Sequence, residues 1–178
     1  MSSIAKTIPV RDDDPSAQLA QAAANAIWDR KGFDVVALRV KDIVGYTDYM
    51  VIASATSDRH AIALSDSVEE HLLKEFRDKP IGVEGRTWGR WVLLDYSDIV
   101  VHIFHRPVRD YYQLQRLFAD APRLELTEPK WVSEVSPDQL IEQSFDYGDE
   151  LWASAALDGE NLEQYEEAEE GDEASAEV

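Results

Sequence analysis

Four histidines are the residues of this chain best suited to acid–base or metal chemistry, and their spacing limits both. His102 and His105 are three residues apart in a segment that reads as a β-strand, so their side chains point to opposite faces of the sheet. His60 and His71 lie eleven residues apart on a predicted helix, and the chain has no Cys. This pattern does not supply the convergent ligands of a zinc site, and it favours ordinary polar or interfacial histidines.

Hydroxyl and glycine motifs give no stronger sign of catalysis. Residues that could form a nucleophile and its base lie close together in the sequence: Ser54, Ser57, His60 and Asp66. Neither serine lies in a Gly-x-Ser-x-Gly elbow, and a helix N-cap explains Ser57 better. The glycines of the middle segment are spaced too widely for a P-loop or a dinucleotide fingerprint, and we expect them to serve turns: Gly82, Gly85 and Gly89.

Two carboxylates flank a predicted hairpin turn, where a pair could hold Mg²⁺ for phosphoryl transfer. Asp98 has a simpler role in the turn itself, whereas Asp95 ends an apolar strand. Alternation gives this strand two faces: Trp91, Leu93 and Asp95 on one, and Val92, Leu94 and Tyr96 on the other. An acidic residue aligned with Trp91 is typical of a protein interface. A core position for Trp91 and an edge position for Asp95 fit the same pattern, and both interpretations stay open.

Basic and aromatic residues are interleaved over residues 83–118, a pattern that can indicate nucleic-acid contact. They include Arg86, Arg90, Arg106, Arg109 and Arg116, with Trp88, Trp91, Tyr111 and Tyr112. Acidic residues in the same stretch interrupt any basic stripe: Glu84, Asp95, Asp98 and Asp110. We therefore expect contact with a protein component of a ribonucleoprotein, and no direct sequence-specific binding of nucleic acid.

Charge divides the chain into two regions. Residues 1–119 carry 17 acidic and 15 basic side chains, a net charge of −2, whereas residues 120–178 carry 19 acidic and two basic ones, a net charge of −17. We predict a flexible N-terminal lead over 1–13, one domain over 14–119 and an acidic, largely disordered extension over 120–178. Nucleic-acid phosphates would repel such an extension.

Hydrophobic periodicity predicts four helices. The first begins at Asp14 as N-cap with Pro15 at its first position, and the last, over 138–144, has Ser136 as its cap. A helix over 58–77 should turn five residues inward: Ile62, Ser65, Val68, Leu72 and Phe76. The remaining helix opens with Pro107 and runs through Phe118.

Four strands are predicted between these helices, over 33–40, 49–55, 88–96 and 99–105. The nearly continuous apolarity of 49–55 indicates burial on both faces. The last two strands form a hairpin with Ser97 and Asp98 at its turn. The fold class is therefore α/β (α+β), a mixed sheet flanked by helices.

Apolar runs in the chain are shorter than a membrane span, and the first residues lack the apolar region of a secretion signal. The absence of Cys suits a reducing compartment. We expect a cytoplasmic protein with no membrane association.

Five motifs follow one another in a fixed order. They are TDYMVIASATSDRH (47–60), VEG (83–85), WVLLD (91–95), VVHIF (100–104) and a helix with Arg109, Tyr112, Leu114 and Leu117. Together they resemble the ribosomal silencing factors, the Iojap/RsfS family, over about residues 16–118. One departure is Ala55 or Thr56 at the place of a family glycine.

The resemblance implies a nucleotidyltransferase-like fold without enzyme activity or cofactor, because the Gly-Ser loop and Asp-x-Asp pair of active members have no counterpart here. It implies binding to the large ribosomal subunit through ribosomal protein L-fourteen. Bound there, the protein would block joining of the small subunit and repress translation when nutrients are scarce. Family members can also form homodimers.

We expect the hairpin and the helix after it to form the ribosome contact: Trp91, Leu93, Asp95, Tyr96, His102, Phe104, Arg109 and Tyr112. Strand alternation does not say which hairpin face is exposed. The alternative function is a nucleotide-binding or residual nucleotidyltransferase-like protein, which requires a carboxylate pair converging on a cleft.

Overall fold

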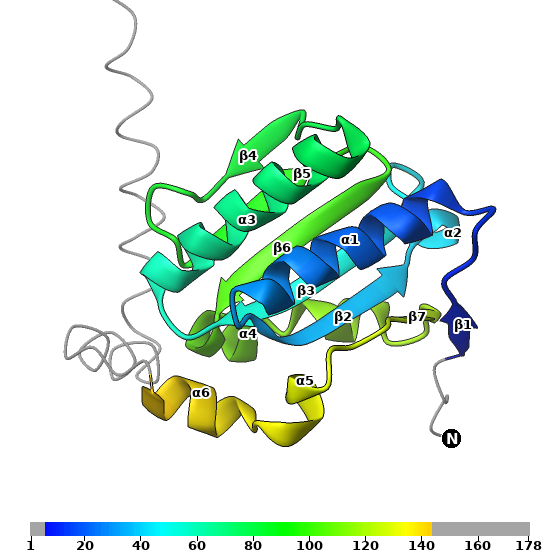
Figure 1. The fold of residues 1–178 in the computed structure, drawn as a ribbon. Coiled ribbons are helices and arrows are strands. Elements are labelled where there is room, and N and C mark those ends of the chain that lie inside the picture. The colour runs from blue at the N-terminus through cyan, green and yellow to red at the C-terminus, as the bar shows by residue number, and fades with distance from the viewer. Residues whose placement is uncertain (1–5, 144–178) are drawn as a thin grey trace, which may run out of the picture. The chain divides into compact units, whose positions relative to one another are not determined.

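One mixed sheet of seven strands organises the computed structural model, which describes residues 6–143 (Figure 1). The strands lie in the order β1-β7-β2-β3-β6-β5-β4. Their bounds are β1 Thr7–Pro9, β2 Phe33–Arg39, β3 Tyr49–Ala55, β4 Gly82–Glu84, β5 Trp91–Asp95, β6 Ile99–His105 and β7 Arg123–Glu125. The pairs β3–β6 and β1–β7 are parallel, and the others are antiparallel.

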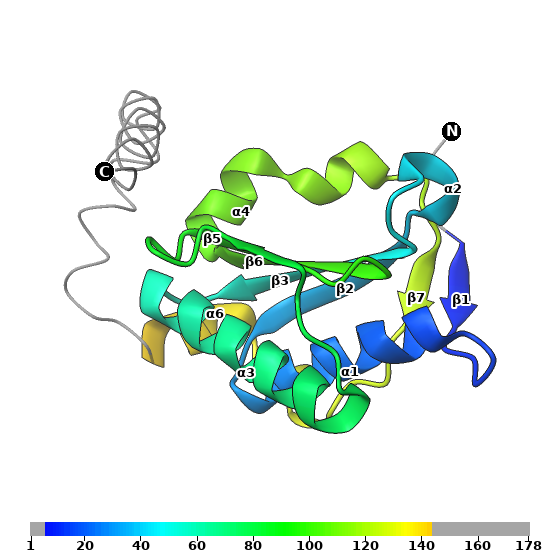
Figure 2. The same ribbon diagram turned by 90° about the horizontal axis from the view of Figure 1, so that it is seen from above.

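Helices cover both faces of this sheet, so the predicted mixed α/β architecture is confirmed. Helices α1 (Pro15–Asp29) and α3 (Asp58–Phe76) lie side by side on one face (Figure 1). Helix α4 (Arg106–Tyr112) and the 3₁₀ helix η1 (Leu114–Phe118) lie over the other face (Figure 2). Three short helices complete the described part: α2 Lys41–Val44, α5 Trp131–Glu134 and α6 Pro137–Gln143. None of the helices within 6–143 is long and apolar enough to cross a bilayer.

Helix α1 begins as the sequence predicts. The Asp14 carboxylate accepts a hydrogen bond from the Ala17 N–H at 3.0 Å, and Pro15 occupies the first turn, where no intrahelical donor is needed. A second oxygen of Asp14 accepts from the Tyr49 hydroxyl at 2.7 Å, which ties the helix start to β3. The buried side of α1 is rich in alanine, which lets the helix pack close to the sheet.

Strands β3 and β6 form the centre of the molecule, and every residue in both is buried. Val51 and Ala53 on β3 pack into the core beneath α1 and α3. The alternate residues Ile52 and Ser54 face the α4 side, where Ser54 accepts a hydrogen bond from Arg109 of α4. The predicted burial of 49–55 on both faces is thus confirmed, since each face of this strand has its own layer of helix.

The inward side of α3 differs in part from the prediction. Ser65, Val68 and Leu72 are buried, but Ile62 is only partly buried and Phe76 is 40% exposed. Ala61 and Leu64 are buried instead. Phe76 is the last residue of the helix, next to the left-handed C-cap Arg77, so its side chain stands at the end of the layer.

The helix predicted from Pro107 through Phe118 is interrupted. Gln113 has φ 49°, in the left-handed region that a continuous α-helix cannot contain. The segment is therefore divided into α4 and η1. Nothing in the side-chain pattern announces this break, because Gln113 is an ordinary helix former.

The sheet also takes strands from both segments predicted to lie outside the domain. β1 falls within the expected flexible lead and β7 within the expected disordered extension, and the two pair with each other in parallel. Leu124 and Ala121 are buried, so the ordered part continues past residue 119. Strands of three residues are too short to show a period in the sequence. Helix α6 with its Ser136 cap is found as predicted, and residues 144–178 of the expected extension lie outside the described residues.

Candidate docking surface on the α4 side of the sheet

Strand pairing decides which face of the predicted hairpin reaches solvent. The hairpin itself is confirmed, with β5 antiparallel to β6 and Ser97 at the turn. Val92 and Leu94 point into the core beneath α3, and they are fully buried. The alternate residues Trp91, Leu93 and Asp95 lie on the α4 side and are only partly buried. We call the partly or fully exposed residues here, Trp91, Leu93, Asp95 and Tyr112, the Trp91 surface.

An aromatic cluster fixes Trp91 at one end of this surface. Its ring stacks on Phe104, its cross-strand partner, with ring centroids 4.7 Å apart, and it contacts Tyr112 of α4 at 5.2 Å. Its indole Nε1–H donates a hydrogen bond to His102 Nδ1 at 3.1 Å. Cross-strand aromatic pairs of this kind stabilise antiparallel strands. Trp91 is therefore held in one orientation while part of its ring stays accessible.

His102 supports this arrangement as a neutral base. Burial lowers the pKa of His102 to about 4, because the charged imidazolium loses its hydration there. At neutral pH the ring is therefore neutral, and the hydrogen bond from the Trp91 indole assigns its proton-free nitrogen to Nδ1. His102 is cross-strand to Leu93, so it lies beneath the middle of the Trp91 surface.

Asp95 closes the hairpin at the other end of the surface. Its Oδ1 accepts a hydrogen bond from the Ser97 N–H at 2.8 Å, and Ser97 has φ 70°. Asp and Asn commonly stabilise turns in this way. On the neighbouring strand β4, Glu84 is paired with Leu93, two residues before Asp95. The Trp91 surface thus combines an aromatic anchor with the carboxylate of Asp95, and Glu84 adds a second carboxylate at its edge.

Half of the predicted contact residues do not reach solvent on this side. Tyr96 is 4% exposed and lies on the opposite face of β5, and Phe104 is fully buried under Trp91. His102 and Arg109 are buried as well, the latter with its guanidinium between α4 and β3. These four side chains can position the surface but cannot contact a large partner directly. Strand alternation correctly groups Trp91 with Asp95, but it carries no information on burial depth.

Sequence reasoning did not select Tyr111 or Glu84. Tyr111 is 53% exposed and packs edge-on against Tyr112, with ring centroids 5.1 Å apart. Because two tyrosines are adjacent in the sequence, a helical pattern alone could have assigned either to the surface. Glu84 joins the surface only through β4, a strand of three residues that the sequence pattern does not reveal.

The other residues considered for catalysis or metal binding hold loops and helix ends in place. Ser57 caps α3 by accepting from the His60 N–H at 3.1 Å, as predicted. His60 Nδ1 accepts from the Thr56 N–H, and its Nε2 lies 2.7 Å from the Arg30 carbonyl oxygen, so His60 joins α3 to the end of α1. His105 Nδ1 lies 2.8 Å from Asp58. Within residues 6–143, no three His, Asp or Glu side chains are grouped to hold a metal ion.

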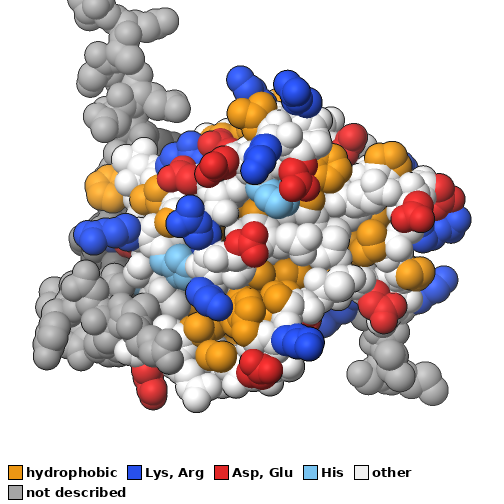
Figure 3. Space-filling view, in the orientation of Figure 1, with side chains coloured by type: hydrophobic (Ala, Val, Ile, Leu, Met, Phe, Trp, Pro, Cys, Tyr) orange, Lys and Arg blue, Asp and Glu red, His pale blue; other side chains and the backbone are white. Residues whose placement is uncertain are grey.

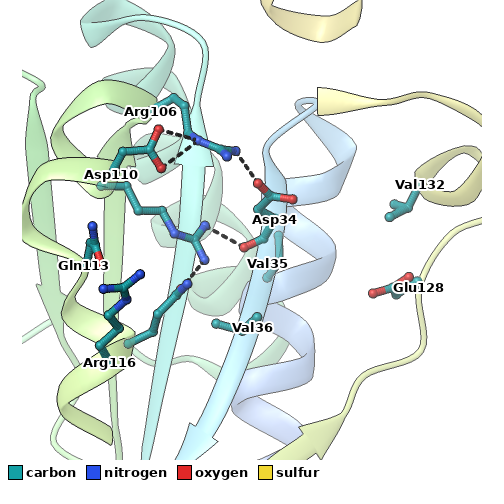
Figure 4. A pocket seen from close by; sticks show the side chains of 11 residues that line it. Asp34, Val35, Val36, Arg106, Asp110, Gln113, Arg116, Glu128 and Val132 are labelled. Atoms are coloured by element: carbon teal, nitrogen blue, oxygen red, sulfur yellow. Dashed lines mark hydrogen bonds and ion pairs between the residues drawn. The ribbon is translucent and has the colours of Figure 1, made fainter. Parts of the chain in front are cut away.

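A cavity of about 670 Å³ lies apart from the Trp91 surface, where β2 faces α4 and η1 (Figure 4). Asp34, Val35 and Val36 of β2 form one wall, with Gln113 and Arg116 opposite them. Arg109, one of the predicted contact residues, also lines this cavity. On the opposite side of the molecule, over α1 and α3, acidic and basic side chains are interspersed around a group of hydrophobic ones (Figure 3).

Comparison with known proteins identifies the family. Residues 13–146 match the family model described as "Ribosomal silencing factor during starvation". A Halalkalibacterium halodurans protein named Ribosomal silencing factor RsfS is 38% identical over 109 residues, which cover 61% of this chain and 92% of that protein. A mouse protein named Mitochondrial assembly of ribosomal large subunit protein 1 is 30% identical over 91 residues, covering 48% of this chain and 38% of the mouse protein.

Solved structures agree with this family. A crystal structure of a Chromobacterium violaceum protein matches with a TM-score of 0.57 and 32% identity, covering 66% of this chain and 92% of that one. The family match runs from α1 to α6 and includes every strand of the sheet except β1, with the strand pair that carries Trp91 among them. The chain belongs to the ribosomal silencing factor family.

Proposed function

We propose that this protein binds the large ribosomal subunit through ribosomal protein L-fourteen, blocks joining of the small subunit and so represses translation. Membership of the ribosomal silencing factor family supports the general role. The docking site is inferred from the Trp91 surface, where a tryptophan with a fixed orientation lies beside Leu93 and Asp95. Buried or half-buried aromatic anchors with a polar rim are the usual energetic centres of protein interfaces.

The charge of the surface favours a protein partner over ribosomal RNA. Asp95 and Glu84 both belong to this part of the sheet, and Asp110 lies one turn or less from Tyr111 and Tyr112 on α4. The net charge of the whole chain is −19. Carboxylates repel phosphates, whereas they pair well with Lys and Arg of a basic protein. A basic ribosomal protein is therefore the partner that this surface suits.

Sedimentation with purified large subunits tests the docking site. The variant Trp91→Ala with Asp95→Ala should lose co-sedimentation, because it removes both the anchor and the charge. A matched control is Glu70→Ala with Leu73→Ala, which removes an exposed acid and an exposed apolar residue from α3 on the opposite side. The control should sediment with large subunits like the parent protein.

Loss of Trp91 also removes packing on Phe104, so folding needs its own check. Asp95→Asn keeps an acceptor for the Ser97 N–H but removes the charge, and Tyr112→Ala trims a side chain that is 41% exposed. Both should weaken co-sedimentation with circular dichroism unchanged. Full co-sedimentation by the folded double variant would rule out the Trp91 surface as the docking site.

Two further measurements address the partner and the consequence of binding. Purified ribosomal protein L-fourteen should be retained by immobilised wild-type protein and not by the double variant. Addition of wild-type protein to separated subunits should reduce the fraction that sediments as joined ribosomes, and it should lower protein synthesis in a reconstituted translation reaction. Binding without any effect on joining would limit the proposal to docking.

A further inference from the structure

The cavity beside β2 exists because the sheet is incomplete there. β7 pairs with β2 only at Leu38 and Arg123, and within residues 6–143 no strand pairs with this edge of β2 at Asp34, Val35 and Val36. The α4–η1 segment forms one side, and Glu128 and Val132 lie across from it (Figure 4). Its volume, about 670 Å³, falls within the range of roughly 300–1,000 Å³ that is usual for small-molecule sites.

Arg106 does not leave positive charge in this cavity. Its guanidinium pairs with Asp110 at 3.0 Å and with the Asp34 carboxylate (Figure 4). These contacts use the two acidic side chains nearest to the α4 end of the cavity. Asp34 and Asp110 exceed Arg106 by one negative charge, and Glu128, on the far wall, is the third acid of a lining that has three arginines.

Arg109, by contrast, is buried with neutral partners. It is 6% exposed, and its guanidinium donates to the Asp34 carbonyl oxygen at 2.6 Å, Ser54 Oγ at 2.8 Å and Gln115 Oε1 at 2.6 Å. These bonds use three of the five N–H groups of a guanidinium. Burial lowers the pKa of Arg109 to about 10, as expected for a cation with reduced hydration.

Arg116 adds a second cation to the same lining. It lies on η1 and is exposed, and within residues 6–143 its guanidinium makes no hydrogen bond or ion pair, although its backbone N–H donates to the Gln113 carbonyl oxygen at 2.8 Å. Gln113, next to it, contributes an amide to the wall. Arginine recognises carboxylates and phosphates through paired N–H donors.

The backbone around the cavity is held in conformations that the sheet itself does not require. Asp34 has φ 48° within a β-bulge of β2, and Gln113 has φ 49° at the break between α4 and η1. Left-handed residues other than glycine are uncommon and are often found at ligand sites. Both strained residues belong to the lining, one on each side.

We propose that this cavity binds a small organic anion, with a carboxylate or phosphate held between Arg109 and Arg116. Val35, Val36 and Val132 offer an apolar wall for the rest of the molecule. The site is separate from the Trp91 surface and does not depend on the proposed docking to the ribosome. A single acid group is the best match, because the lining has three arginines against three acids and so offers no large excess of positive charge.

Titration of the full chain with simple probes tests the site. Phenylacetate and phenyl phosphate supply an acid group and an apolar ring, and phenylacetamide is the neutral isostere of phenylacetate. Both acids should bind saturably and shift the side-chain amide signals of Gln113 and Gln115 in NMR spectra. Phenylacetamide should bind at least roughly tenfold more weakly, since charged hydrogen bonds are lost.

Arg116→Gln should weaken both acids roughly tenfold without a change in fold, because Arg116 is exposed and holds no other group. Arg59→Gln, an equally exposed arginine on α3, is the matched control and should bind the probes normally. The proposal is overturned if neither acid binds saturably, if phenylacetamide binds as well as phenylacetate, or if Arg116→Gln and Arg59→Gln behave alike.

Discussion

His102 is buried as the neutral base, and this predicts a loss of stability on acidification. Burial lowers the pKa of His102 to about 4, from 6.5 for the unperturbed group. Between these two values the unfolded chain binds the proton and the native protein does not. Folding stability must therefore fall on acidification. The contribution of His102 to the free energy of unfolding is complete above about pH 6.5 and is lost progressively as the pH falls toward 4.

The magnitude follows from the same two pKa values. At pH 4.5 they give a loss of about 2 kcal/mol in the free energy of unfolding, relative to pH 7. Protonation of Nδ1 also removes the acceptor for the Trp91 indole N–H. Tryptophan fluorescence of the native protein should therefore change only near pH 4, where the native imidazole itself takes up the proton.

Two variants isolate this contribution from the other titrating groups. His102→Gln does not titrate but keeps an oxygen that can accept from Trp91, and His102→Leu keeps the apolar volume alone. Urea unfolding at pH 7 and at pH 4.5 gives, for each protein, the decrease in the free energy of unfolding on acidification. The parent protein should lose about 2 kcal/mol more than either variant. His60, whose pKa burial also lowers, contributes equally to all three and cancels.

Equal acid losses in the parent protein and His102→Gln would refute the reasoning, because they would mean that His102 is hydrated in the native state. Equal acid losses in all three proteins, together with a lower stability of His102→Leu than of His102→Gln at pH 7, would have a different meaning. It would show that the hydrogen bond to Trp91 matters but that burial does not set the pKa.

Two further predictions concern the frame of the fold. Asp14→Ala should cost roughly 2–4 kcal/mol in urea unfolding, because it removes both the cap of α1 and the acceptor of the Tyr49 hydroxyl, whereas Asp14→Asn should retain most of the cap. Burial raises the pKa of Asp14, but the bonds from Tyr49 and Ala17 and the charges of Arg39 and Lys41 outweigh it and lower the pKa, so this stability should fall as the native carboxylate is protonated in acid. Gly85→Ala should cost at least about 2 kcal/mol in the same assay, since its Cβ would lie 1.8 Å from the Trp91 carbonyl oxygen at φ 72°. Gly45→Ala has a similar φ of 74° with open space around it and should cost less, and equal costs would show that the contact at Trp91 is relieved easily.

Long periodic segments were predictable from the sequence, and short ones were not. The cap at Asp14 and the hairpin of β5 and β6 follow from local chemistry that sequence patterns carry. β1, β4 and β7 have three residues each and exist because a neighbouring strand offers hydrogen-bond partners. These strand pairings depend on the tertiary fold and leave no pattern in the sequence. The domain boundary predicted at residue 119 therefore excluded β7, which lies at Arg123–Glu125.

Burial depth was the second limit. Trp91 and Phe104 read alike in the sequence, as aromatic residues on neighbouring strands. The register places them opposite each other, with Phe104 inside and Trp91 partly outside, because α4 crosses over β6 and leaves β5 less covered. Arg109 shows the same limit: a charged residue in a helix reads as exposed, but its guanidinium is buried against Ser54.

Four of the predicted contact residues form a buried inner layer, and the other four form an outer layer that is at least partly exposed. This division bears on how the Trp91 surface would bind a partner. A side chain that is free before binding must be ordered on binding, which costs roughly 0.5–1.5 kcal/mol for a flexible one. Trp91 is already held by the ring of Phe104 beneath it and by the hydrogen bond to His102, so little of this cost remains. If the surface docks as proposed, Phe104 and His102 act on binding through the orientation of Trp91, while the carboxylates of Asp95 and Glu84 select against phosphates at the same face. Under the proposed docking, affinity depends on both layers, but selectivity for a basic protein over RNA depends on the outer one alone.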